Sequence, residues 1–272
     1  MRNLLIGVFA VLVTLICSGP SGAETIHVPA AFASIQAAIE AASPNDTIIV
    51  EEGVYTENLV IGRPVTILSA KGPAATVVSA ARSGEATIKI SGTSDVSLSG
   101  FTANGSGVAG ILLTDVHGAV LTNNRAVENL YGIAVYDSTG VRMSENIANR
   151  NTSYGVYLYR SNDNIIENND ANANKDKGFF ISYSDNNRIM NNNANQNTWD
   201  GMTFWSSHGN VIKNNVTLRN TFGLVMSESS GNSIDDNTTL PNVVLILPIF
   251  LIYMGIITYI VQKNILKLVY RS

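Results

Sequence analysis

Apolar residues recur in pairs along the middle of the chain, each pair following a glycine that returns every 22 or 23 residues. The residues one and three positions after each glycine are apolar, which is the alternation of a strand with one buried face. Eleven positions after each glycine another large apolar residue predicts a second inward-facing strand. The six glycines of this register are Gly110, Gly132, Gly155, Gly178, Gly201 and Gly223.

An asparagine stands fourteen positions after every one of these glycines. A helical repeat would instead need apolar stripes at 3.6-residue spacing and few glycines or asparagines. Short strands can all pair only if successive copies stack as coils about 4.8 Å apart, so the pattern predicts a parallel β-helix. The asparagines should then form a ladder of side-chain hydrogen bonds, and each glycine should mark a tight turn. The ladder residues are Asn124, Asn146, Asn169, Asn192, Asn215 and Asn237.

These repeats resemble the NosD-like, pectin-lyase-type β-helix repeats, which run Gly-Ile-x-Leu, a turn with serine, and Asn-x-Ile-x-Asn-Asn. Five of the six copies carry that serine. The resemblance covers about residues 46–238 and implies an all-β fold, a right-handed single-stranded parallel β-helix of about eight coils. The serines are Ser138, Ser161, Ser184, Ser207 and Ser229.

The first 23 residues have the pattern of a secretory signal peptide. Arg2 provides the positive charge, residues 4–16 the apolar stretch, and residues 21–23 the small side chains before a cleavage site. Cys17 is the sole cysteine, so the processed chain would contain no disulfide. A lipoprotein anchor at Cys17 is the less favoured alternative, because Ile16 precedes it where processing needs a small residue.

The remaining segments predict a cap, the coil and an anchor. Residues 24–45 should form an N-terminal cap whose short helix begins after Ser34 and plugs the open end of the coil. Residues 46–240 should form the β-helix. Residues 241–262 are apolar and predict a transmembrane helix, with a buried capping helix as the alternative. Residues 263–272 are basic and predict a cytoplasmic tail, which places the β-helix outside the cell membrane after secretion.

Composition narrows the partners. The chain has 272 residues, 14% of them charged, and a formal net charge of −4. A nucleic-acid partner is not expected, because binding phosphates needs a basic surface.

Aromatic side chains occupy the outward strand positions, two and four after the glycines, in neighbouring copies. Sugar rings stack on such faces, so this aromatic strip is a candidate polysaccharide-binding surface. The alternative is that the rings only stack on one another as cross-strand pairs. The aromatic strip consists of Tyr136, Tyr157, Tyr159, Phe180 and Trp205.

Charged residues follow the strip five positions after three successive glycines, at Asp115, Asp137 and Arg160. Two carboxylates one coil apart would raise the pKa of one of them, as in an acid and base pair, and Arg160 could bind a uronate carboxylate. These three are the candidate catalytic residues. The alternative is an ordinary ion pair between Asp137 and Arg160. A second charged cluster with the same two interpretations consists of Asp176, Lys177 and Asp200.

Two enzyme families with this type of fold have motifs that the chain lacks. Polygalacturonases carry Asn-Thr-Asp, Asp-Asp and Gly-His-Gly on successive coils, whereas the only Asp-Asp here is Asp235-Asp236 in the last copy. Pectin methylesterases need Gln-Asp and Asp-Phe-Ile-Phe-Gly, and neither is present. The resemblance therefore implies a fold without implying either activity.

Copper handling, which the NosD resemblance suggests, needs clustered imidazole or sulfur ligands. His27, His117 and His208 are far apart in the repeat register, and Met143 and Met202 occupy inward positions, so no metal or cofactor is expected.

The sequence favours a cell-surface β-helix protein that binds a glycan or builds the envelope without catalysis. The first alternative is a polysaccharide lyase, hydrolase or epimerase acting on an acidic polysaccharide. The second is a NosD-like periplasmic accessory protein connected with copper.

Overall fold

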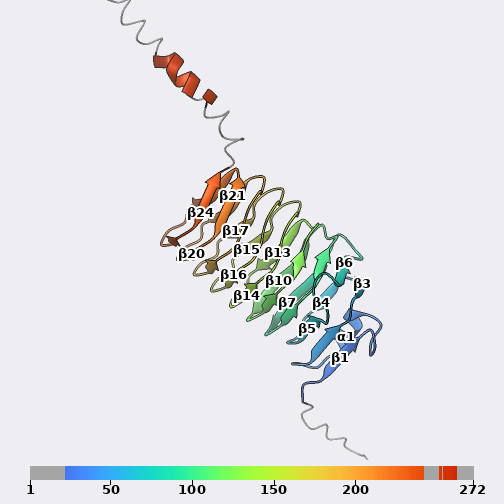
Figure 1. Ribbon diagram of the computed structural model, residues 1–272. Coiled ribbons are helices and arrows are strands. Elements are labelled where there is room, and N and C mark those ends of the chain that lie inside the picture. The colour runs from blue at the N-terminus through green and yellow to red at the C-terminus, as the bar shows by residue number, and fades with distance from the viewer. Residues whose placement is uncertain (1–21, 242–250, 253, 262–272) are drawn as a thin grey trace, which may run out of the picture.

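The computed structural model describes residues 22–241, 251, 252 and 254–261. The strands wind into a rod whose turns contribute strands to parallel sheets, two of which run along most of its length while the third is interrupted (Figure 1). The protein is thus an all-β right-handed parallel β-helix of about nine turns, close to the eight predicted.

Three sheets form the sides of the rod. Sheet A has ten strands: β1 (Thr25–Val28), β2 (Thr47–Val50), β5 (Thr66–Ser69), β8 (Ser97–Ser99), β11 (Val120–Thr122), β14 (Arg142–Ser144), β16 (Ile165–Glu167), β18 (Arg188–Met190), β20 (Val211–Lys213) and β23 (Ser233–Asp235). Sheet B is interrupted: β3 (Gly53–Thr56), β6 (Thr76–Ser79), β9 (Thr102–Asn104) and β12 (Arg125–Ala126), then β21 (Val216–Asn220) and β24 (Thr238–Pro241). Sheet C has eight strands: β4 (Leu59–Ile61), β7 (Ile88–Ser94), β10 (Ala109–His117), β13 (Tyr131–Tyr136), β15 (Val156–Tyr159), β17 (Phe179–Ser182), β19 (Asp200–Trp205) and β22 (Phe222–Ser227).

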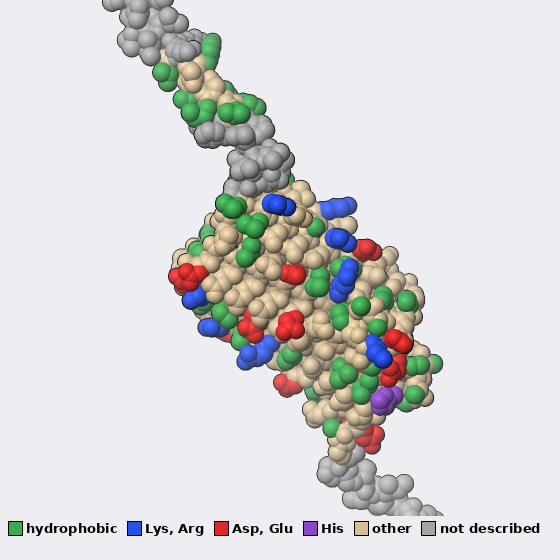
Figure 2. All heavy atoms as spheres, viewed as in Figure 1, with side chains coloured by type: hydrophobic (Ala, Val, Ile, Leu, Met, Phe, Trp, Pro, Cys, Tyr) green, Lys and Arg blue, Asp and Glu red, His purple; other side chains and the backbone are tan. Residues whose placement is uncertain are grey.

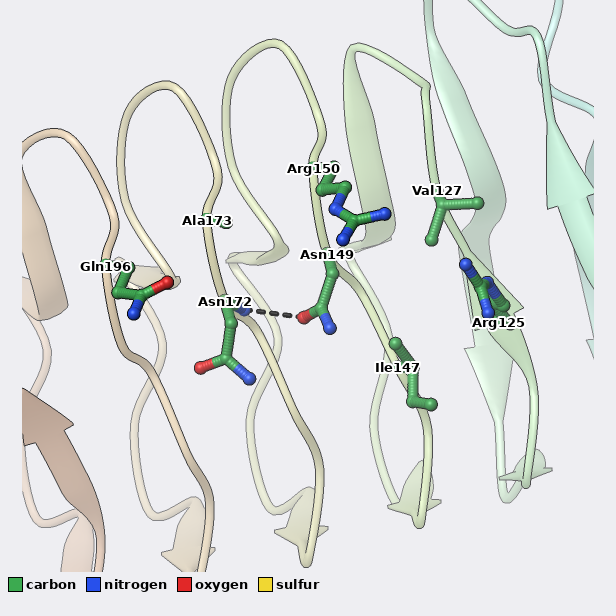
Figure 3. A pocket seen from close by; sticks show the side chains of 8 residues that line it. All are labelled: Arg125, Val127, Ile147, Asn149, Arg150, Asn172, Ala173 and Gln196. Carbon is green, nitrogen blue, oxygen red and sulfur yellow. Dashed lines mark hydrogen bonds between the residues drawn. The ribbon is translucent and has the colours of Figure 1, made fainter.

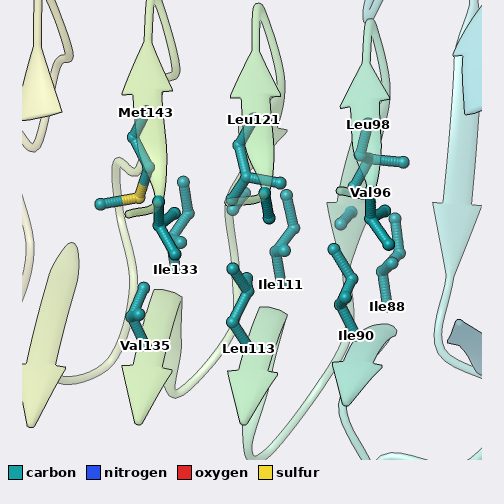
Figure 4. Close-up of a cluster of buried hydrophobic side chains, with 14 of the residues drawn as sticks. Ile88, Ile90, Val96, Leu98, Ile111, Leu113, Leu121, Ile133, Val135 and Met143 are labelled. Carbon is teal, nitrogen blue, oxygen red and sulfur yellow. The ribbon is translucent and has the colours of Figure 1, made fainter. Parts of the chain in front are cut away.

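The core is a set of stacked apolar side chains, as the repeat register predicts. Ile111 of β10 lies opposite Ile133 of β13, and Leu121 of β11 lies opposite Met143 of β14. These four side chains are buried, and Figure 4 shows them in aligned columns along the rod. Because identical positions stack, each coil buries the apolar surface that its neighbour would otherwise expose.

The predicted asparagine ladder is present. Asn146 donates from its backbone N–H and its side-chain NH₂ to Oδ1 of Asn169, at 2.9 and 3.0 Å, and its side chain also donates to the carbonyl of Leu121 at 2.8 Å. The same bonds repeat from Asn124 to Asn237. Buried turn groups thereby find partners that water cannot supply.

Two further asparagine ladders were not predicted from the sequence. One stands nineteen positions after the glycines and the other nine positions after the last four of them. They connect neighbouring coils through the same backbone-to-Oδ1 bonds. The serines form a comparable series from Ser138 to Ser229. The additional ladder residues are Asn129, Asn151, Asn174, Asn197 and Asn220, and Asn164, Asn187, Asn210 and Asn232.

The predicted role of the repeat glycines as tight turns was wrong. None of the six is among the residues with positive φ. The residues five positions later hold that conformation instead, with φ 49° at Asp137 and 48° at Arg160. A side chain at Gly132 would collide with the backbone of the next coil, so these glycines permit a close approach between coils.

The N-terminal cap is present, and the sheet begins earlier than the predicted residue 46. β1 already pairs with β2 in sheet A, so the first strand precedes the helix. Helix α1 (Ile35–Ala41) begins at Ser34, whose side chain accepts from the N–H of Ala37 at 3.2 Å. Its residues Ile35, Ala38 and Ile39 are buried against the end of the core.

Most of the predicted export and anchoring segments lie outside the described residues. These are the signal peptide at 1–23, apart from its last two residues, the basic tail at 263–272, and most of the transmembrane helix expected at 241–262. Residues 251, 252 and 254–261 are helical. Within the part of the chain that the structure describes, no helix is long and apolar enough to cross a membrane, so the expected span is not supported.

Candidate functional site

Aromatic side chains gather on the outer face of sheet C, over β13, β15 and β17. The parallel register places Tyr157 opposite Phe180 and Tyr136 opposite Tyr159, as their positions in the repeat predict. We call the connected rings the aromatic cluster. It consists of Tyr131, Tyr136, Tyr154, Tyr157, Tyr159, Phe180 and Tyr183.

The rings of the aromatic cluster pack on one another along the rod. Tyr131 stacks on Tyr154 with centroids 5.3 Å apart, and Tyr157 stacks on Phe180 at 5.2 Å. Tyr136 meets Tyr157 edge-on at 5.5 Å. The cross-strand stacking, which the sequence allowed as the alternative to sugar binding, is therefore present. Most of these rings are only half-buried, so a continuous aromatic surface still faces solvent.

The cluster differs in membership from the predicted strip. Trp205 lies in the row of Tyr159, but Ser182 of the intervening coil separates the two. Tyr131 and Tyr154 were missed, although both stand one position before a repeat glycine. Tyr183, five positions after Gly178, was also missed.

Arg160 borders one edge of the aromatic cluster. Its Nε lies 2.9 Å from Oδ1 of Asp137, and its guanidinium carbon lies 4.8 Å from the centroid of the Tyr159 ring. The predicted ion pair is present, and both side chains remain about half exposed. Asp137 is thus paired with a cation of the next coil. The candidate catalytic residues Asp115, Asp137 and Arg160 occupy the same left-handed turn position in consecutive coils.

A shallow hollow of about 480 Å³ connects this ion pair with the rings. It is lined by Thr114, Tyr131, Tyr136, Asp137, Tyr157, Tyr159 and Arg160.

Lys177 lies at another edge of the aromatic cluster, beside Tyr154 and Phe180. Its Nζ lies 5.6 Å from the centroid of the Tyr154 ring and 5.7 Å from that of Phe180. The same nitrogen lies 2.9 Å from Oδ1 of Asp176 and 3.8 Å from Oδ2 of Asp200. The second charged cluster of the sequence is therefore part of the same surface. Cations lie at two edges of the rings, each held by carboxylates.

Burial changes the ionisation of the tyrosines. Desolvation, with smaller contributions from Tyr131 and Tyr154, raises the pKa of Tyr157 to about 12. Desolvation also raises the pKa values of Tyr131, Tyr136 and Tyr154. The hydroxyl groups therefore stay protonated near neutral pH, where they serve as hydrogen-bond donors rather than as bases.

The histidines lie apart from the aromatic cluster. His117 Nδ1 lies 2.7 Å from Oγ1 of Thr139, and His208 Nδ1 lies 2.9 Å from Oγ of Ser230. Met143 and Met202 are buried in the core. Among the described residues, no group of three His, Cys, Asp or Glu side chains is placed to hold a metal ion.

On the face shown in Figure 2, acidic and basic side chains are scattered over a surface that is mainly neutral. The aromatic cluster and its two edges combine flat apolar rings, neutral donors and fixed charges. The chemistry of this surface suits ring stacking and hydrogen bonding to a hydroxyl-rich ligand.

Fold and surface together define a β-solenoid with an aromatic outer face. The family model of the right-handed β-helix region matches residues 86–239, so the chain belongs to that family. No curated protein sequence matches the chain.

Several solved structures share the fold at low sequence identity. The catalytic domain of a GH87 α-1,3-glucanase, in complex with nigerose, aligns with a TM-score of 0.57 and 18% identity, over 78% of this chain and 46% of that one. Pectate lyase Pel9A aligns with a TM-score of 0.52 and 15% identity, over 80% of this chain and 78% of that one. The protein ORF18 of Geobacillus virus E2 aligns with a TM-score of 0.52 and 13% identity, and this chain spans 60% of its length.

Proposed function

We propose that the protein binds a polysaccharide along the aromatic cluster on the outer face of sheet C. The observation that carries this proposal is the half-exposed surface of rings between Arg160 and Lys177. Flat rings contact the C–H faces of sugars at little entropic cost, because each aromatic side chain has only two rotatable bonds. A wide open surface suits a polymer better than a small enclosed ligand.

The edges of the cluster add selectivity. The guanidinium of Arg160 is half exposed even though Asp137 binds one side of it. A uronate carboxylate could share this guanidinium, since Arg presents several donors in a plane. The hydroxyl groups of Tyr136 and Tyr157 are neutral donors for sugar oxygens near neutral pH.

Affinity electrophoresis of the full-length chain, kept in a non-ionic detergent, tests this proposal. Gels would contain dextran, polygalacturonate or no polymer. The variant Tyr157→Ala/Phe180→Ala removes one stacked pair of rings, and we expect it to lose retardation. The matched control is Trp199→Ala/Phe222→Ala, which removes two exposed aromatic side chains outside the cluster. Equal migration of both variants in every gel would refute a binding role for the cluster.

The second candidate function is cleavage or epimerisation of a polysaccharide. It is supported by the names of the structural relatives, which include a pectate lyase and a glucanase, and by the position of Asp137 and Arg160 beside the cluster. A search for products released from the polymer that is bound, comparing the unaltered chain with Asp137→Asn, tests it. Products that disappear in the variant would establish catalysis, and their absence from the unaltered chain would leave binding alone.

A location outside the cell membrane agrees with this ligand class. The apolar segments at 1–23 and 241–262 carry the sequence patterns of export and anchoring. Protease treatment of intact cells that make the full chain tests this location. Digestion of the β-helix without lysis is expected, and full protection would refute it.

A further inference from the structure

A second hollow, of about 320 Å³, lies along sheet B and the turns that follow it, on a different side of the rod from the aromatic cluster. Figure 3 shows that neighbouring coils contribute to it, with Arg125 and Val127 on one coil and Asn149 and Arg150 on the next. The volume falls near the lower end of the range of ligand sites, about 300–1,000 Å³.

The side-chain amides of Asn149 and Asn172 present their NH₂ groups to this hollow, because their oxygens already accept hydrogen bonds from the backbone. Oδ1 of Asn149 accepts from the N–H of Asn172 at 2.6 Å, and Oδ1 of Asn172 accepts from the N–H of Asn195 at 2.7 Å. A backbone N–H can meet only the oxygen of an amide, so the orientation of both side chains is fixed. Their NH₂ groups are left to donate to a ligand.

The two arginines add positive charge that the protein does not neutralise. Neither Arg125 nor Arg150 forms an ion pair with a carboxylate in the described part of the chain. Glu128 stands one coil before Arg150 at the same repeat position, without an ion pair between them. By contrast, Arg160 on the aromatic side is paired with Asp137.

We propose that this hollow, which we call the arginine hollow, binds a carboxylate or sulfate group of an acidic polysaccharide. Guanidinium groups bind such planar or tetrahedral oxyanions through paired hydrogen bonds, and the two asparagine NH₂ groups add neutral donors. Val127 and Ile147 provide an apolar lining for the C–H face of the sugar. No aromatic side chain lines the hollow, which disfavours a single-stranded nucleic acid, because its bases would need stacking partners.

The arginine hollow binds independently of the aromatic cluster, so the two proposals can fail separately. In the full-length chain, Asn149→Asp keeps the oxygen that accepts from Asn172 but replaces the donor with a negative charge. The control Asn162→Asp makes the same change where Oδ1 accepts from the N–H of Asp185 at 2.7 Å, on a turn outside the hollow. The second pair is Arg125→Ala/Arg150→Ala against Arg142→Ala/Arg188→Ala, which removes two exposed cations from sheet A.

The probes are dextran sulfate, polygalacturonate and neutral dextran in affinity electrophoresis at low salt. We expect both hollow variants to bind at least one charged polymer about tenfold more weakly, equivalent to about 1.4 kcal/mol, while their controls bind like the unaltered chain. Retardation by neutral dextran should persist in the hollow variants and disappear in Tyr157→Ala/Phe180→Ala. The proposal is overturned if the unaltered chain ignores both charged polymers, or if hollow and control variants lose affinity equally.

Discussion

A Cβ atom added at Gly132 would lie 2.5 Å from the carbonyl oxygen of Gly155 in the next coil. The same added Cβ atom would lie 2.7 Å from the side-chain nitrogen of Asn151. Both neighbours are held by hydrogen bonds between coils, since the Gly155 carbonyl accepts from Ile133 at 2.9 Å and Asn151 belongs to a ladder. The spacing of the coils at sheet C therefore depends on the absence of a side chain here.

We expect Gly132→Ala to lower the free energy of unfolding by about 1–3 kcal/mol, because the backbone of two coils must move apart. Gly84→Ala is the control, since no atom lies within 4 Å of a Cβ added there. Urea unfolding followed by circular dichroism measures both. Equal midpoints for the two variants would contradict the close approach.

The asparagine ladder should dominate the stability of the turns. Asn169→Ala removes the acceptor for two donors of Asn146 and a donor to Asn192. Because these groups are buried and cannot recruit water, we expect a loss of about 3 kcal/mol. Asn195→Ala is the control, since that side chain accepts one bond from Leu218 in a half-exposed position. Thermal unfolding would show a small shift for the control, and similar shifts would contradict a special role for the ladder.

The repeat made most of the core predictable. Stacked coils place residues of equal repeat position opposite one another, so the inward positions of Ile111 and Leu121 and the ladder at Asn146 follow from the sequence. The first strand, β1, precedes the repeat and has no glycine to mark it. The collision at Gly132 depends on the distance between coils, which spacing along the sequence does not contain.

The candidate site was predictable only in part. Tyr157 and Phe180 sit at outward strand positions, so the alternation reveals them. Tyr131 and Tyr154 stand before the glycine, where the chain leaves a turn, and only the folded backbone brings them over sheet C. The arginine hollow depends on the direction of the Asn149 amide, which is set by a backbone N–H of another coil.

Tyrosine ionisation should make the protein sensitive to alkali. The pKa of Tyr157 is raised from 10.0 to about 12 in the folded chain, so folding favours the protonated form of its hydroxyl group. Its contribution to stability is full below pH 10 and is lost as the pH rises through 12. We expect unfolding midpoints to fall over this window, with a shallower fall in Tyr157→Phe. Identical slopes for both proteins would argue against the shift.

The ion pair between Arg160 and Asp137 should matter more for ligands than for folding. Both side chains are about half exposed, and such pairs contribute at most about 1 kcal/mol. Arg160→Gln should therefore leave the melting temperature nearly unchanged while weakening retardation by polygalacturonate more than by dextran. Arg188→Gln, on sheet A, is the control for net charge. A large drop in melting temperature would show that the pair is structural.

Trp205 tests the boundary of the aromatic cluster. Although it is the largest exposed ring at an outward position of the predicted strip, Ser182 separates it from Tyr159. A polymer stacked on the connected rings would gain little from it, so we expect Trp205→Ala to change affinity less than about twofold, against about tenfold for Tyr157→Ala. Titration with the polymer that retards the unaltered chain gives both values. A loss in Trp205→Ala as large as in Tyr157→Ala would mean that the ligand follows the row of Tyr136, Tyr159 and Trp205 rather than the connected rings.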